Sequence, residues 1–404
     1  ARIHYFVGSW NAWVTEQWNT RAIPALAHAY ALTNDEKYAD RAGFFLDALA
    51  AIYAESTSGS WDYPSSPPSG RFARPWYQVA RPLVPFVEAY DLVFSSASML
   101  RPSLRPELER TRRTGQTGQT SQTGPTAQQR AMGTPDAHGL SWAGMTRRDN
   151  INKNLMEDGA YYCYSHTFSG GLHNGHADYM RGALAVGVLL GVPEYVHNAV
   201  ESPYSIYAML ANNVDRDGRY YETALGYEQH THDLYLTFVE PLLNWRDERY
   251  PQGVRLFDDP RMLAFYRLPA LGLQLCGHAP NYGDAGPDNR HLQPPARPFD
   301  ASDYHFAERL YAGCQGESKQ EYARLLTFLC DGDVEKQRAA SNLKRWLLYH
   351  ADPVSPAKSE IPNLKSEIPG ELQRQVFGSW FLGQKGIALL RDGSTSHTVP
   401  LTEA

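Results

Sequence analysis

Apolar residues recur at helical spacing along most of this chain, and this periodicity most limits the folds open to it. Residues 22–30 and 38–53 each carry one apolar stripe, and the turn Thr33-Asn34-Asp35 between them supplies helix stop and cap residues. Two amphipathic helices joined by so short a turn form an antiparallel helical hairpin. The same spacing predicts helices at residues 79–94, 178–190, 204–213, 231–245, 260–268, 319–329 and 334–350.

The pattern changes near the end of the sequence. Residues 375–381 and 386–391 predict two strands of a hairpin, joined by residues 382–385. Before them, residues 355–374 contain KSEIP twice and indicate a linker. We therefore expect a mainly helical domain over residues 1–354, then the linker, and the start of an antiparallel β-domain over residues 375–404.

Two segments inside the helical part depart from its periodicity. Residues 113–130 (RTGQTGQTSQTGPTAQQR) have low complexity and no apolar anchors, which predicts a flexible surface loop. Residues 269–304 are rich in Gly, Pro, His, Asn and Asp, and an irregular segment of that length in a compact domain is usually functional.

Composition excludes several classes of protein. A chain of 404 residues that is 42% hydrophobic can bury a sizeable core, but its longest apolar run, residues 182–192, is far below the roughly 20 residues of a membrane span. We expect a soluble protein without a membrane partner. The net charge of -6 argues against nucleic acid as the main partner. The four cysteines are too few and too scattered for a disulfide scaffold or a zinc site, and no leader pattern precedes the first helix.

The segment GGLHNGHADY, residues 170–179, is the first group of chemically useful side chains. His173, Asn174, His176 and Asp178 gather at the start of a predicted helix, where unpaired N–H groups favour anions, and the glycines let a ligand approach the backbone. The alternative is structural, with Asn174 or Asp178 capping the helix and the histidines lying on the surface.

The second group lies in residues 215–232, where a turn leads into three tyrosines, two histidines and two glutamates. A phenol acts as a base near neutral pH only where cations or donors stabilise the phenolate, and His230 and His232 are candidates for that task. The alternative is that Tyr227 and its neighbours pack a helix interface. The Asp-x-Asp-Gly start lacks the ligand spacing of a calcium loop.

Two further groups suit substrate contact. Residues 276–286 hold His278 and Tyr282 in the long irregular segment, and residues 76–81 place Tyr77 beside Arg81. Aromatic rings stack on sugars, and a guanidinium group binds carboxylates. The alternatives are a surface loop without a role for residues 276–286 and an ordinary surface charge for Arg81. The sequence contains no Gly-rich phosphate loop, nucleophile elbow or H-E-x-x-H metal motif.

Taken in order, these segments resemble the heparinase II/III-like and alginate-lyase-like polysaccharide lyases. The likeness is carried by the first helical hairpin and by the segments HNGHADYMRGALAVGVLLG, DGRYYETALGY, PNYGDAG and FGSWFLGQKGIALLRDG. It implies a mainly α fold, an (α/α) toroid that is an incomplete barrel of helical hairpins, followed by an antiparallel β-sandwich. It also implies cleavage of a uronic-acid polysaccharide by β-elimination.

The resemblance assigns roles to residues. Asn174 and His176 match the pair that neutralises the sugar carboxylate, and Tyr227 matches the catalytic tyrosine. His173 competes with His176 in this sequence, since the order is His-Asn-Gly-His. His230 and His278 are candidates for a second proton-transfer residue.

Substrate contacts and cofactors follow from the same resemblance. Arg81 is expected to anchor the carboxylate, with Tyr77, His173, His278 and Tyr282 lining the substrate. No cofactor or catalytic metal is expected. Some relatives hold a structural zinc in the sandwich, for which this sequence offers no assignable ligands.

The resemblance implies an acidic polysaccharide or oligosaccharide as partner and a secreted or periplasmic location, because such polymers lie outside the cytoplasm. Alginate, glucuronan and heparan-type chains all fit, and the oligomeric state stays open. Two other functions compete with this one. A glycoside hydrolase on the same toroid would use paired carboxylates, of which Glu222 and Asp284 are the obvious pair. A helical carbohydrate-binding module would have no catalytic activity.

Overall fold

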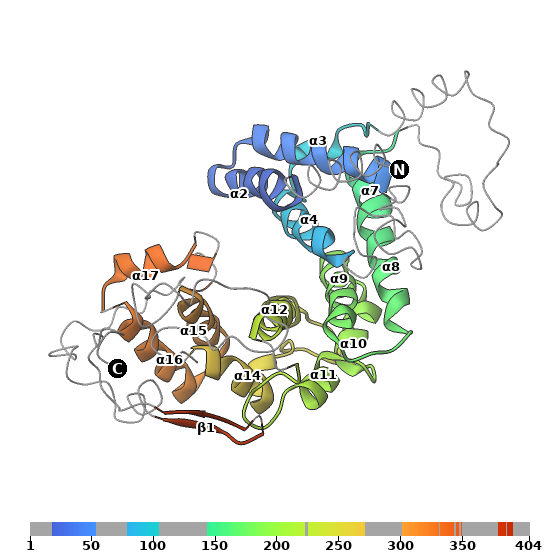
Figure 1. Ribbon diagram of the computed structural model, residues 1–404. Coiled ribbons are helices and arrows are strands. Elements are labelled where there is room, and N and C mark those ends of the chain that lie inside the picture. Colours follow the sequence, from blue (N-terminus) through green and yellow to red (C-terminus); the bar gives the residue numbers. More distant parts are fainter. Residues whose placement is uncertain are drawn as a thin grey trace, which may run out of the picture. The chain divides into compact units, whose positions relative to one another are not determined.

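The computed structural model describes residues 18–53, 79–104, 144–222, 225–270, 301–330, 332–342, 345–346, 349, 379–384 and 386–390. Helices make up most of this part of the chain, and its strands are two short ones near residue 385 (Figure 1). The predicted mainly α class is confirmed. No helix within the described ranges is both long enough and apolar enough to cross a membrane.

The first helical hairpin forms as predicted. After the π-turn η1 (Trp18–Ala22), α2 (Ile23–Thr33) ends at Asn34, whose φ of 53° lies in the left-handed region and whose N–H donates to the Tyr30 carbonyl. Asp35 then caps α3 (Glu36–Ile52) by accepting a hydrogen bond from the Lys37 N–H. The turn residues therefore act as the sequence indicates.

The remaining helices of the N-terminal half include several that the periodicity did not reveal. The elements are α4 (Ala80–Val93), η4 (Ala97–Leu100), α7 (Arg147–Ile151), η7 (Asn152–Glu157), α8 (Asp158–Thr167), α9 (Asn174–Leu190), α10 (Pro193–Glu201) and α11 (Ile206–Asn213). The helix predicted at residues 178–190 begins one turn earlier, at Asn174. The sequence places Pro82 and Pro85 in the first turns of this helix, where proline is best tolerated, but the structure places Pro85 inside α4.

Helix α9 lies at the centre of this half. It packs against α4, α8 and α10. Gly182 permits the close approach, since a Cβ added there would lie 2.8 Å from the Cys163 Sγ of α8 and 2.9 Å from the Ala80 Cβ of α4. Leu83, Leu155 and Val186 belong to the buried apolar cluster around it. Burial of this apolar surface holds the start of α9 in place.

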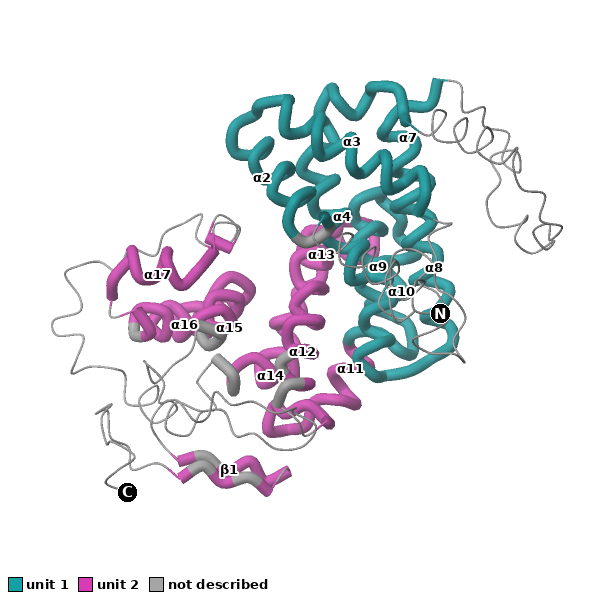
Figure 2. Tube along the Cα trace, turned by 45° about the horizontal axis from the view of Figure 1, so that its top comes forward, with its two compact units in different colours: residues 1–206 teal, residues 207–404 magenta. Residues whose placement is uncertain are grey.

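The chain divides into two compact units, residues 1–206 and 207–404 (Figure 2). The division falls inside the segment predicted as one helical domain, so that domain assignment stays a prediction. Within the second unit α14 packs on α15, and α15 on α16 and α17.

In the second unit two predicted helices are interrupted, and α14 and α16 are longer than predicted. The helical elements described in this unit are α12 (Leu225–Leu236), α13 (Val239–Asn244), η8 (Leu256–Asp258), α14 (Pro260–Ala270), α15 (Ala301–Gly313), α16 (Gly316–Leu329) and α17 (Val334–Ala340). The helix predicted at residues 231–245 is two helices, α12 and α13. The helix predicted at residues 334–350 is broken at Ser341, whose φ and ψ of -83° and 170° are extended.

The predicted hairpin is present. Strands β1 (Trp380–Leu382) and β2 (Ile387–Leu389) pair antiparallel, with Phe381 opposite Ala388. The strands are shorter than predicted. The Gln384 N–H at the hairpin turn donates to the Asp217 carboxylate at 2.8 Å, which ties the hairpin to the turn after α11.

Gly182→Val should destabilise the first unit. The added methyl groups meet Cys163 and Ala80 where no space exists, and overpacking of this kind costs about 1–3 kcal/mol. Ala185→Val, three residues along on a partly buried face of α9, is the matched control. Urea unfolding followed by circular dichroism measures the difference, and equal midpoints for both variants would show that the helices are not in close contact at Gly182.

Candidate functional site at the start of α9

The first turn of α9 has no side-chain cap. His173 is the N-cap residue, its side chain is exposed, and it makes no capping hydrogen bond. Asn174 is already the first helical residue, and Asp178 lies one turn further on. Neither residue caps the helix, so the structural alternative for this cluster does not hold.

Asp178 instead accepts from two guanidinium groups. Its carboxylate is 1% exposed and lies 3.3 Å from the Arg81 Nε of α4 and 2.7 Å from the Arg181 Nη2 of α9. A buried carboxylate is stable only where donors satisfy its oxygens. Arg81, the expected carboxylate anchor, is 39% exposed and is held by Asp178 one helical turn from Asn174.

His176 points into the protein. Its side chain is 2% exposed, and its Nε2 has no hydrogen-bond partner within the described residues. Burial, together with the nearby His173, lowers the pKa of His176 to about 4. The imidazole is therefore neutral at pH 7, which allows it to donate or accept a hydrogen bond without carrying charge.

The glycine turn before α9 brings backbone and rings close together. Gly170 has a φ of 76°, and a Cβ built on it would lie 2.7 Å from the Tyr204 Oη. The Tyr204 ring in turn meets the His176 ring edge-on, with 5.5 Å between the ring centroids. This contact could not be predicted from the sequence, because Tyr204 lies in the turn after α10 and no spacing pattern links it to α9.

The predicted tyrosine base lies in the second unit. Tyr227 is in the first turn of α12 and is 40% exposed, and His230 is half-buried one turn later. Asn174, His176, Arg81 and His173 all belong to the first unit. The first unit therefore holds the predicted carboxylate-binding residues, and the second unit holds the two predicted proton-transfer residues, Tyr227 and His230.

A buried ion pair fixes the start of α12. The Glu228 carboxylate lies 2.6 Å from the Arg219 guanidinium and accepts from the Tyr220 N–H at 3.2 Å, which ties the turn at residues 215–222 to the helix. His232 has no role beside a phenolate. It is buried, stacks on Phe265 and bonds to its carbonyl at 2.8 Å, and burial lowers the pKa of His232 to about 3.

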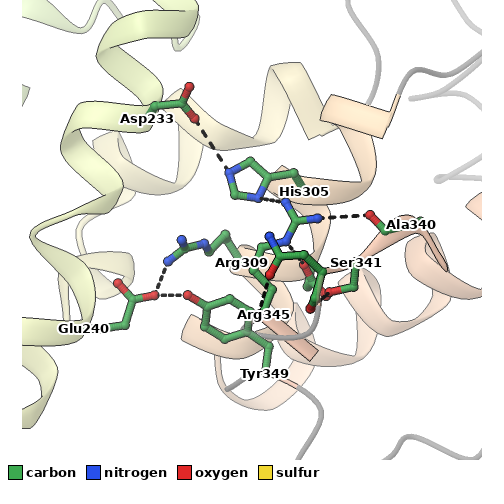
Figure 3. A network of polar contacts seen from close by, with 10 residues as sticks. Asp233, Glu240, His305, Arg309, Ala340, Ser341, Arg345 and Tyr349 are labelled. Carbon is green, nitrogen blue, oxygen red and sulfur yellow. Dashed lines mark hydrogen bonds and ion pairs between the residues drawn. The ribbon is translucent and has the colours of Figure 1, made fainter. Parts of the chain in front are cut away.

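A second polar network, which the sequence did not reveal, explains the break after α17 (Figure 3). Arg345 donates to the Ala340 carbonyl at 3.0 Å and to the His305 Nδ1 at 2.6 Å, and its Nε lies 3.1 Å from the buried Glu308 carboxylate. Ser341 also donates to Glu308, at 2.5 Å. These bonds satisfy the end of α17 and hold the following segment on α15.

The same network contains a defined imidazole. A guanidinium group only donates, so the His305 Nδ1 accepts and a neutral ring carries its proton on Nε2, which lies 3.7 Å from the Asp233 carboxylate. Beside it, Glu240 on α13 receives both Arg309 and the Tyr349 hydroxyl. All of these contacts join elements of the second unit. We therefore interpret the network as one that stabilises the packing of these elements.

Three predicted substrate contacts, Tyr77, His278 and Tyr282, lie outside the described residues, as does Asp284. Glu222, which would pair with Asp284 in a glycoside hydrolase, accepts a hydrogen bond from the Tyr221 hydroxyl at 3.1 Å. Among the described residues no group of three or more His, Cys, Asp or Glu side chains is arranged to hold a metal ion. Comparison of the sequence with protein-family models and with curated proteins finds no match.

Asp178→Asn should destabilise the first unit by about 2–3 kcal/mol. This is less than the roughly 3–5 kcal/mol for breaking a fully buried pair, because Arg81 is partly exposed. Lys37→Gln, which removes an exposed ion pair with Asp35, is the control and should change stability far less, because solvent screens exposed charges. Denaturant unfolding compares the two, and a loss at Asp178 no larger than at Lys37 would contradict the assignment.

The buried neutral His176 makes stability depend on pH. Its pKa is about 4 in the folded chain and about 6.5 in an unfolded one, so between these values the unfolded chain binds more protons. The free energy of unfolding should therefore fall as the pH drops from about 6.5 towards about 4, by about 2 kcal/mol between pH 7 and pH 5. His176→Gln should lose that part of the dependence in urea titrations at the two pH values. An unchanged dependence would mean that His176 is solvated.

Proposed function

We propose that this chain is a polysaccharide lyase that cleaves a uronic-acid-containing polysaccharide by β-elimination. The single observation that carries the proposal is the state of His176, a neutral buried imidazole with an unpartnered Nε2 next to Asn174 and an uncapped helix start. We further propose that the helical hairpins form an (α/α) toroid and that β1 and β2 begin an antiparallel β-sandwich.

The chemistry of the reaction explains why such groups are needed. The C5 hydrogen of a uronic acid is weakly acidic, and the adjacent carboxylate opposes further negative charge. Hydrogen bonds from the Asn174 amide and from His176 to that carboxylate would stabilise the enolate-like intermediate. A carboxylate arriving beside His176 also raises the affinity of the ring for a proton, which strengthens the hydrogen bond as charge develops.

Tyr227 is the proposed proton-transfer residue. A base removes the C5 hydrogen as a proton, and the electron pair of the broken C5–H bond forms the C4–C5 double bond. The C4–O4 bond breaks at the same time, and the leaving O4 takes up a proton. Two observations support this role: the Tyr227 side chain is 40% exposed, and the buried ion pair between Glu228 and Arg219 holds the start of α12 in place. His230, one turn along, is the proposed second proton-transfer residue.

The proposed partner is an acidic polysaccharide or oligosaccharide, and a protein acting on it is proposed to be secreted or periplasmic. Arg81 supports this choice of substrate. Asp178 orients its guanidinium group beside the first turn of α9, where it adds a cation on the side of Asn174.

Tyr227→Phe should abolish the increase in ultraviolet absorbance that a conjugated C4–C5 double bond produces, while uronate binding persists. Loss of a proton-transfer group lowers turnover by about 10²–10⁴-fold. Tyr221→Phe, an equally exposed tyrosine on the turn before α12, is the matched control and should turn over normally. The assay uses a panel of uronic-acid polymers and records absorbance and reducing ends together.

Each other outcome overturns the proposal in a recognisable way. Normal turnover by the Tyr227→Phe variant removes Tyr227 from the mechanism. Reducing ends without absorbance indicate a glycoside hydrolase, and binding without either signal indicates a carbohydrate-binding module.

A further inference from the structure

Tyr204 lies over the most buried member of the proposed site. It belongs to the turn between α10 and α11, it is 37% exposed, and its ring meets that of His176 at an interplanar angle of 62°. Tyr204 is therefore in ring contact with His176 and is also partly exposed to solvent. Both residues lie within the first unit.

The Gly170-Gly171 turn holds the other side of the Tyr204 ring. A Cβ at Gly170 would lie 2.7 Å from both the Cζ and the Oη of Tyr204, so the phenol end rests directly on the Gly170 backbone. The φ of 149° at Gly171 continues the turn past the His173 ring. The Tyr204 ring thus lies between a side-chain-free turn and the first turn of α9.

His176 bears a cost in this arrangement. A buried polar atom without a partner has lost its hydrogen bonds to water and gained none in return. Among the residues that the structure describes, the ionisable groups that face His176 are His173 on its own segment and Tyr204 from the turn after α10, and neither supplies a partner for Nε2. A ligand that reached Nε2 would relieve this cost.

We propose that Tyr204 is a positioning residue that screens His176 from water. An incoming uronic acid sugar displaces the Tyr204 ring and then forms a hydrogen bond with the His176 Nε2, which the displacement has exposed. This inference rests on the proposed function for the identity of the ligand, while the screening of His176 does not. The contacts that hold the Tyr204 ring are packing contacts with Gly170 and His176. The released ring face is an apolar surface against which a sugar ring can lie.

The screening is tested without any activity assay. Diethyl pyrocarbonate acylates neutral accessible imidazoles, and mass spectrometry of the full-length protein after digestion gives the rate at each histidine. His176 should react slowly in the unmodified protein, and Tyr204→Ala should raise its rate by about tenfold or more by opening the site. Tyr204→Phe keeps the ring and should leave the rate unchanged. Tyr161→Ala, an exposed tyrosine on α8, is the control.

A titration separates loss of screening from loss of structure. With histidines labelled at Cε1 and the His176 signal assigned from His176→Gln, Tyr204→Ala should move the His176 titration midpoint up from about 4 towards about 6.5. Tyr204→Leu, which keeps an apolar side chain over the ring, is the second variant if the alanine variant unfolds, and its midpoint should rise less. The buried His232 should stay unreactive in every folded variant.

Two results overturn the inference. The first is reaction of His176 in the unmodified protein as fast as that of the exposed His173, and the second is an unchanged labelling rate and titration midpoint of His176 in Tyr204→Ala. If the chain proves to be a lyase, Tyr204→Ala should also raise KM more than it lowers kcat. If it proves not to cleave uronates, the labelling and titration still decide the screening by Tyr204.

Discussion

The arrangement of the first unit depends on one buried carboxylate. Asp178 accepts from Arg81 of α4 and from Arg181 of its own helix, and so locks α9 against α4 in both rotation and position. Residues four and seven apart lie on one face of a helix, so Asn174, Asp178 and Arg181 form a single stripe. The position of the Asn174 side chain therefore depends on the ion pairs of Asp178, one helical turn further along α9.

His176 lies on the opposite side of the first turn of α9 from Asn174. Two residues along a helix from Asn174, its side chain is directed away from the stripe and under Tyr204, where burial keeps it neutral. The first turn thus offers an amide on one side and a neutral imidazole on the other, with an oriented guanidinium group nearby. This combination suits a carboxylate ligand better than a cation or an apolar one.

The local signals in the sequence predicted local structure well. Asn34 and Asp35 end α2 and begin α3 because their side chains and backbone preferences act within one turn. The break at Ser341 was not predictable, since it depends on Glu308 and on Arg345, and Glu308 lies more than thirty residues earlier in the chain. Apolar periodicity identifies the buried face of a helix, but it contains no information on polar contacts between residues far apart in the sequence.

The candidate site shows the same limit. The cluster of His173, Asn174 and His176 was identified from residue types alone, but its geometry was not. Tyr204 contributes through a turn 28 residues after His176 in the sequence, and Asp178 proved to be an ion-pair partner and not a cap. Contacts formed by folding, which no spacing rule records, decide which of these side chains is buried and which is open.

The most direct measurement is a crystal structure of the Tyr227→Phe variant with a uronic acid oligosaccharide bound. The account predicts one sugar carboxylate within hydrogen-bond distance of Asn174 and His176, with the ring at position 227 against the C5 hydrogen of that sugar. An oligosaccharide bound away from the first turn of α9, or a position 227 that does not touch the sugar held there, would contradict it.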